Sequence, residues 1–134
     1  MSLGSWDPAA DAAAHEIQID PAILGRFIGY SRDEQLSQLE QLIGADENQV
    51  LAGLMQTEHS AWIAATQSMA EDDLLHLIRF FAVAENLPGW EAGAKSPVIP
   101  LAKTLRKRGA RLDKPLLRWL REVNDNRFLP YGPL

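Results

Sequence analysis

Apolar residues recur at spacings of three and four along most of the chain, which is the periodicity of amphipathic α-helices. The first such run follows Asp20-Pro21, a pair typical of an N-cap and the first helical position. Gly29 is its predicted end. No segment alternates with the period of two that a half-buried strand shows. The sequence therefore predicts an all-α fold.

Two capping boxes mark further helix starts, Ser31 with Glu34 and Ser68 with Glu71. In such a box each side chain satisfies a backbone N–H that the helix leaves without a partner. The first box predicts a helix up to Gly44. The second predicts the most apolar helix of the chain, which continues to about residue 86.

Three more helices follow from similar signals. One is predicted from its cap Asp46 to residue 66, and one from Ser96-Pro97 to Gly109. Asp113 caps the last, which runs to residue 123.

The 134 residues predict one domain, because domains cluster near this size. Residues 1–18 are interpreted as a loosely ordered N-terminal arm and residues 19–123 as a bundle of five to six helices. Residues 124–134 are an extended apolar tail that packs on the bundle or on a partner. An irregular array of helical hairpins is the alternative arrangement.

Charge is distributed unevenly along the chain, although the formal net charge is only −5. Residues 1–94 hold 3 Lys/Arg and 15 Asp/Glu, whereas residues 95–134 hold 10 Lys/Arg and 3 Asp/Glu. Such asymmetry indicates either a basic surface for a partner or attraction between the two parts of one fold.

Cations at helical spacing in the basic part could share one surface, and several cations on one surface can neutralise phosphates. Lys114 lies in the turn between the predicted helix that ends at Gly109 and the last predicted helix. The candidates for binding a polyanion such as nucleic acid are Lys103, Arg106, Lys107, Arg108, Arg111 and Arg118.

Other features of the sequence favour a solvated face or a protein contact for these cations. Arg118 precedes Glu122 by four residues, a spacing at which the two charges can pair. Arg108 lies at a helix end, where a cation complements the helix dipole without any ligand. The last helix carries no Asn or Gln on its first turns to contact base edges.

Aromatic and apolar residues near the C-terminus are the other candidates for contact with a partner. The tail is too apolar for a free end, and its prolines lower the cost of ordering it. The partner-binding candidates are Trp90, Phe128, Leu129 and Tyr131.

Catalytic signatures are weak. The chain has no cysteine and no G-x-S-x-G motif, and residues 89–96 do not have the spacing of a phosphate-binding loop. Asp72, Asp73 and His76 share a helical face, where a surface ladder is favoured over a metal site. No cofactor, metal or catalytic residue is predicted.

The sequence therefore favours a non-catalytic helical module for protein interaction or regulation, which contacts a protein partner or a second copy of itself. A nucleic-acid-binding domain that uses the basic third of the chain is the alternative. An enzyme with a dispersed carboxylate or histidine site is the third hypothesis. The lack of a long apolar run or a secretory signal predicts a cytoplasmic location without membrane contact.

Overall fold

The computed structural model describes residues 19–129, and every regular element in this range is helical, which confirms the all-α prediction. None of these helices is long and apolar enough to cross a bilayer. The arm predicted for residues 1–18 lies outside the described range.

The described residues form seven α-helices instead of five or six. In chain order they are α2 (Pro21–Arg32), α3 (Leu39–Leu42), α4 (Ala45–Ala52), α5 (His59–Thr66), α6 (Glu71–Ala84), α7 (Val98–Lys107) and α8 (Lys114–Val123). Short 3-10 turns lie at Leu36–Gln38, Gly53–Gln56 and Gly93–Lys95.

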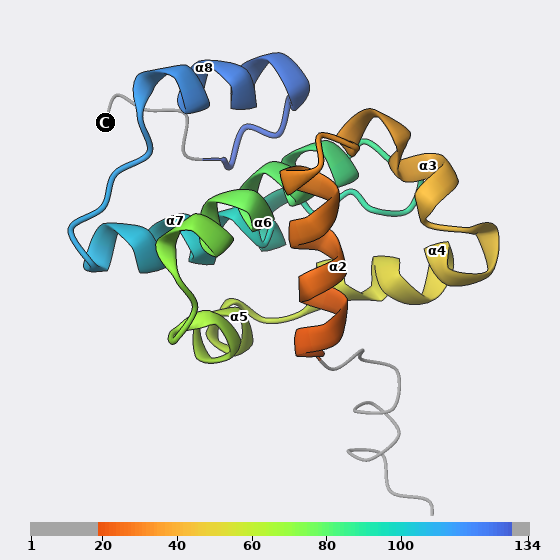
Figure 1. The fold of residues 1–134 in the computed structure, drawn as a ribbon, viewed down its shortest axis with the longest axis horizontal. Helices are drawn as coiled ribbons and strands as arrows, with labels where there is room; N and C mark the ends of the chain where they lie inside the picture. Colours follow the sequence, from red (N-terminus) through yellow and green to blue (C-terminus); the bar gives the residue numbers. More distant parts are fainter. Residues whose placement is uncertain (1–18, 130–134) are drawn as a thin grey trace, which may run out of the picture.

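Helix α6 lies at the centre because apolar side chains cover most of its circumference, so it must be surrounded. Helices α2 and α7 pack extensively on it, and α8 covers one side (Figure 1). Phe27 of α2 stacks on Phe80 of α6 with ring centroids 3.9 Å apart. Helix α2 runs across α6, so the arrangement is less regular than a bundle of parallel helices.

Two of the three predicted Asp caps are present. Asp20 accepts a hydrogen bond from the backbone N–H of Ala22, and Asp113 accepts one from that of Leu116. Each is followed by a proline within the first turn. Local chemistry therefore fixes where α2 and α8 begin.

The capping box predicted at Ser31 does not form. Helix α2 continues through Gly29 to Arg32, and Ser31 lies buried in its last turn. Its Oγ is 2.8 Å from Nδ1 of His76 on α6, so a contact between helices replaces the predicted local one. The chain then turns at Glu34, which has a positive φ.

The other two predicted starts are also wrong. Ala70 precedes α6 without a side-chain cap, and α4 begins after Gly44, so that Asp46 lies in its first turn. The helix predicted over 46–66 is broken into α4 and α5. A 3-10 turn begins at Gly53, and Thr57 is extended. This break lets the apolar residues on both sides of it face the same core.

Candidate functional site

Helix α7 presents three cations because its other faces are buried. Ser96 closes the turn before it, and its Oγ accepts a hydrogen bond from the backbone N–H of Val98. The buried positions of α7 include Leu101 and Leu105, which pack in the core. The exposed positions of α7 are Lys103, Arg106 and Lys107.

The connection to α8 continues this basic surface. Gly109 has a φ of +83°, a conformation that glycine adopts without strain, and it ends α7 as predicted. Leu112 is buried, which fixes the connection to the core. Arg111 and Lys114 on either side of it are exposed, as is Arg118 one turn into α8.

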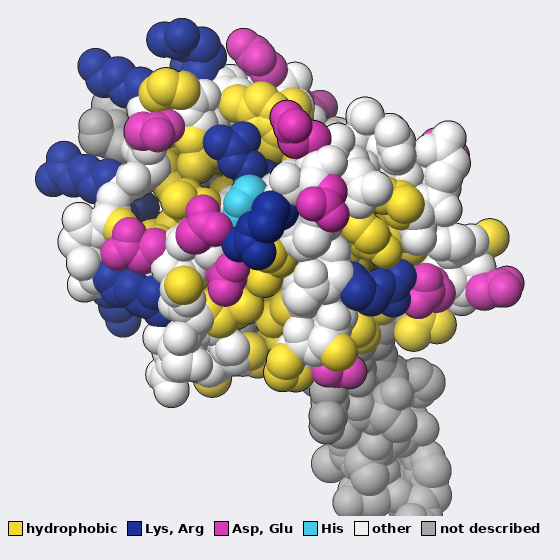
Figure 2. Space-filling view, in the orientation of Figure 1, with side chains coloured by type: hydrophobic (Ala, Val, Ile, Leu, Met, Phe, Trp, Pro, Cys, Tyr) yellow, Lys and Arg dark blue, Asp and Glu magenta, His cyan; other side chains and the backbone are white. Residues whose placement is uncertain are grey.

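Six exposed cations therefore follow one another along α7, the connection and α8. We call them the basic ridge, and they are Lys103, Arg106, Lys107, Arg111, Lys114 and Arg118. Between residues 19 and 129, no ion pair involves any of them. Figure 2 shows Lys and Arg side chains along the edge that α8 and the end of α7 occupy in Figure 1, with acidic side chains scattered over the same view.

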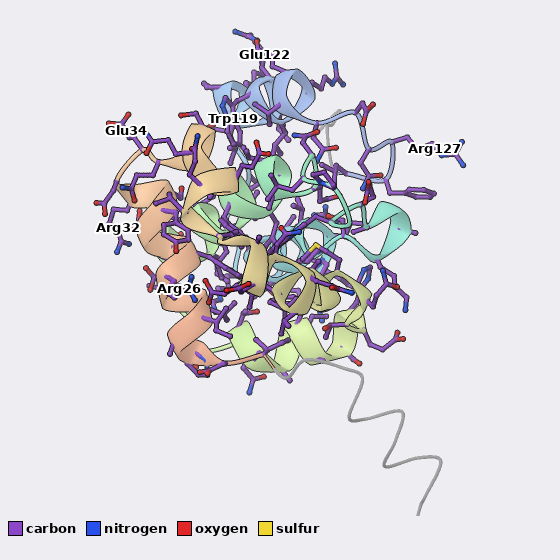
Figure 3. The ribbon with its side chains drawn as sticks, turned by 90° about the vertical axis from the view of Figure 1, so that its right-hand side faces the viewer. Arg26, Arg32, Glu34, Trp119, Glu122 and Arg127 are labelled. Carbon is purple, nitrogen blue, oxygen red and sulfur yellow. The ribbon has the colours of Figure 1, made fainter. Side chains whose placement is uncertain are left out.

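The expected pairing of Arg118 with Glu122 is absent from the ion pairs of the described residues. Both residues are exposed, and Glu122 lies on the outer side of α8 (Figure 3). The side chain of Asp113 is engaged in capping α8. The carboxylates nearest in sequence to the ridge therefore leave its cations accessible.

Arg108 differs from its neighbours, although the sequence groups it with them. Its guanidinium donates hydrogen bonds to the backbone carbonyls of Gln67 (2.6 Å) and Met69, and a longer one (3.4 Å) to Thr66. These carbonyls lie at or just after the end of α5, where a helix leaves its C=O groups without partners. Arg108 thus holds α5 against α7.

Two of the four predicted partner-binding residues are in the core. Trp90 is 0% exposed, and its Nε1 donates to Oδ1 of Asn48 at 2.8 Å. Leu129 is 5% exposed. Neither side chain is available to a partner, whereas Phe128 is 47% exposed and Tyr131 lies outside the described residues.

Hydrogen bonds of Asn124 and Asn126 hold the start of the tail in place, and neither residue was identified from the sequence. Asn124 is extended, and its side-chain amide donates to the backbone carbonyl of Ala82. Asn126 accepts from the backbone N–H of Phe128, so the chain turns here instead of staying extended. Leu129 then enters the core.

A buried carboxylate also joins this part of the tail to α6. Glu85 is 6% exposed and accepts hydrogen bonds from Ser96 Oγ (2.6 Å) and Asn126 Nδ2 (3.0 Å). Burial raises the pKa of the Glu85 carboxyl, and the two hydrogen bonds oppose this shift. An open cavity of about 210 Å³ lies beside it, lined also by Glu91 and Asp125. Since these hydrogen bonds span 11 and 41 positions, no local signal could reveal them.

The predicted acidic and histidine ladder is part of a contact between α2 and α6. Arg32 forms ion pairs with Asp72 (2.7 Å) and Asp73 (2.9 Å), and His76 Nε2 is 3.7 Å from Asp72. Ser31 is hydrogen-bonded to the other ring nitrogen. Ser31 is buried in the last turn of α2, so this set of side chains joins α2 to α6.

Between residues 19 and 129, no group of three His, Cys, Asp or Glu side chains is arranged to hold a metal ion. Residues 19–129 thus form an all-α fold with a basic edge along α7 and α8. No family model, curated protein or solved structure matches this chain.

Proposed function

We propose that the protein is a non-catalytic binding domain that docks on a negatively charged macromolecule through the basic ridge. One observation carries the proposal. The ridge cations are exposed and take part in no ion pair with the described residues, in a chain whose net charge is −5. Unpaired cations gathered on one edge produce a local positive potential that attracts polyanions, whatever the net charge.

The proposal also follows from what the other surfaces offer. Two of the apolar residues that were expected to contact a partner, Trp90 and Leu129, are buried in the core. Among the described residues only Val50 and Phe128 are large, apolar and exposed. A protein that docks through an apolar patch exposes a contiguous one, and two residues do not provide it.

Heparin–agarose chromatography near neutral pH tests the proposal, because an acidic protein is retained on this anionic matrix only through a local basic surface. We expect the protein to be retained above about 0.15 M NaCl, where exposed charges are screened beyond about 8 Å. The triple variant Lys103→Gln, Arg106→Gln and Lys107→Gln is expected to elute below that salt concentration.

The matched control carries Gln41→Glu, Gln49→Glu and Gln56→Glu, three exposed positions outside the ridge. It has the same net charge as the triple variant but an intact ridge, so we expect it to elute with the parent protein. Elution of the parent below about 0.15 M NaCl contradicts the proposal. Equal loss of retention in both variants also contradicts it, since only net charge would then matter.

A further inference from the structure

We infer that the partner of the basic ridge is the sugar–phosphate backbone of a double-stranded nucleic acid, bound without recognition of its bases. The inference rests on the proposed function and names the partner class. Three properties of the ridge favour this partner: the lack of apolar anchors, the spread of the cations over two helices, and the lack of Asn and Gln for contact with bases.

The ridge lacks the anchors that an acidic protein partner would need. Stable protein interfaces have a desolvated core in which a few aromatic or apolar side chains provide most of the binding free energy. The two large apolar side chains exposed in the described range, Val50 and Phe128, belong to α4 and the tail. Neither helix of the ridge carries one, so its contacts are electrostatic.

The spread of the cations suits a regular array of phosphates. Helix α7 has 10 residues and is therefore about 15 Å long. Lys103, Arg106 and Lys107 occupy one side of it, and Arg111 and Arg118 extend the ridge onto the connection and α8. Duplex DNA carries one charge for about every 1.7 Å of its axis, so several of these cations can contact phosphates at once.

Both helices of the ridge lack part of the usual set of side chains that distinguish one base from another. The exposed side chains of α7 are Lys or Arg, and those of α8 are Lys, Pro, Arg and Glu. Base edges in the major groove are recognised chiefly by hydrogen bonds from Arg, Lys, Asn and Gln that reach into the groove. Asn and Gln are absent from both helices, and the Lys and Arg that remain also bind phosphates, which carry no sequence information.

The ridge also lacks a stacking surface for unpaired bases. Proteins that bind single strands place successive bases on aromatic side chains. Trp119 is the aromatic residue of α8, and it is half-buried with the guanidinium of Arg79 5.1 Å from its ring centroid. A duplex, which needs only backbone contacts, is therefore preferred over a single strand.

Acidic residues limit the length of the contact. Asp113 lies within the ridge, but its carboxylate is held by the backbone N–H of Leu116. Glu122 is exposed one turn after Arg118 and repels phosphate. The contact thus begins near Lys103 and ends near Arg118, with at most six cations.

Fluorescence anisotropy with labelled duplexes of about 20 base pairs tests the inference over roughly 0.05–0.2 M NaCl. Two DNA duplexes of unrelated sequence and one RNA duplex are compared with a single strand, and poly-L-glutamate serves as the non-nucleic polyanion. We expect equal affinity for both DNA sequences, weaker binding of the single strand, and a log–log salt slope approaching about −5 for duplex DNA.

Single substitutions sharpen the measurement. Lys103→Gln and Arg118→Gln, at the two ends of the ridge, are each expected to reduce the size of the slope by about 0.9, the value of one phosphate contact. Gln49→Glu is exposed and lies outside the ridge, so it is expected to leave the slope unchanged. A slope that responds equally to all three overturns the inference.

The probes separate the possible failures. Binding of poly-L-glutamate without binding of any duplex overturns the inference and leaves the proposed function standing. Binding of neither overturns both. A tighter complex with the single strand, or more than about a tenfold preference between the two DNA sequences, overturns the backbone-only duplex contact. Binding of the DNA duplex, the RNA duplex or both supports it.

Discussion

Two arginines in the acidic part of the chain form ion pairs, whereas the cations of the basic ridge form none with the described residues. Arg26 and Arg32 extend from α2 (Figure 3), and each makes an ion pair with another helix, Arg26 with Glu47 on α4 and Arg32 with Asp72 on α6. The ridge cations make none with any residue from 19 to 129. The first group connects helices, whereas the second faces solvent.

A shortage of carboxylates does not explain this difference, because the chain has 18 Asp/Glu for 13 Lys/Arg. The hydrogen bond from Arg26 lowers the pKa of Glu47, and the hydrogen bond that Arg32 donates to Asp72 is the largest cause of the raised pKa of Arg32. The pKa values of Glu47 and Arg32 therefore depend on contacts that exist only in the folded protein. The ridge cations form no ion pair with residues 19–129, so they can be changed without a large cost to stability.

The largest expected effect separates binding from folding. Reversing three ridge arginines, Arg106→Glu, Arg111→Glu and Arg118→Glu, is expected to weaken duplex binding by at least about 100-fold, since several phosphate contacts become repulsive. The free energy of unfolding should change by no more than about 0.5 kcal/mol for each exposed site. Anisotropy and urea unfolding of the same samples measure both. If the variant unfolds more readily but binds the duplex normally, the ridge cations stabilise the fold and do not bind phosphate.

Glu85 provides the next largest effect, this time on stability. Glu85→Ala leaves Ser96 Oγ without its acceptor and removes one of the two acceptors of Asn126 Nδ2, which is expected to cost about 1–3 kcal/mol. Duplex binding should not change, because Glu85 is buried outside the ridge. Urea unfolding measures the loss, and an unchanged unfolding midpoint contradicts it.

Glu85→Gln tests the charge of this side chain through its pH dependence, because the loss of one of its two acceptor oxygens is the same at every pH. Because burial raises the pKa of Glu85, the folded state binds more protons than the unfolded state above the ordinary range of a carboxyl. Its contribution to stability is therefore complete at lower pH and declines as the pH rises through the raised value. The stability of Glu85→Gln relative to the parent should increase from about pH 4 to pH 7. A constant difference over this range contradicts the assignment.

Arg108 and Arg111 provide a smaller and more direct comparison, since they are three positions apart in the same basic segment. Arg108→Ala removes hydrogen bonds to the carbonyls after α5 and is expected to lower the free energy of unfolding by about 1 kcal/mol. Arg111→Ala should change it by less than about 0.5 kcal/mol. Duplex binding is expected to show the reverse order. Equal effects on stability would mean that the two cations have the same role.

The sequence predicted those parts of the fold that local chemistry determines. The all-α class, the Asp caps of α2 and α8, and the glycine that ends α7 are all local signals, and the structure has each of them. The predicted starts at Ser31, Asp46 and Ser68 failed because capping residues are common and tertiary packing decides which are used. Ser31 is the clearest case, as its hydroxyl contacts His76, 45 positions away.

The candidate site was likewise predictable only where local spacing determines it. Helical spacing placed Lys103, Arg106 and Lys107 on one exposed face, and the structure agrees. Spacing could not show that Arg108 turns toward the end of α5, because its acceptors lie about 40 positions earlier. It also could not show that Trp90 is buried, since a tryptophan in a loop can face solvent or the core.

The smallest expected effect is the loss of stability when the ion pair between Arg26 and Glu47 is removed. Glu47→Gln removes an exposed carboxylate whose pKa the Arg26 hydrogen bond lowers, so its contribution to stability is present at neutral pH and is lost as the pH falls through the lowered value. The variant should be slightly less stable than the parent at pH 7, by less than Arg108→Ala, and the difference should shrink at about 1 M NaCl because salt screens exposed pairs. Urea unfolding at both salt concentrations measures it. A larger loss at high salt would show that Glu47 stabilises α4 by something other than its charge.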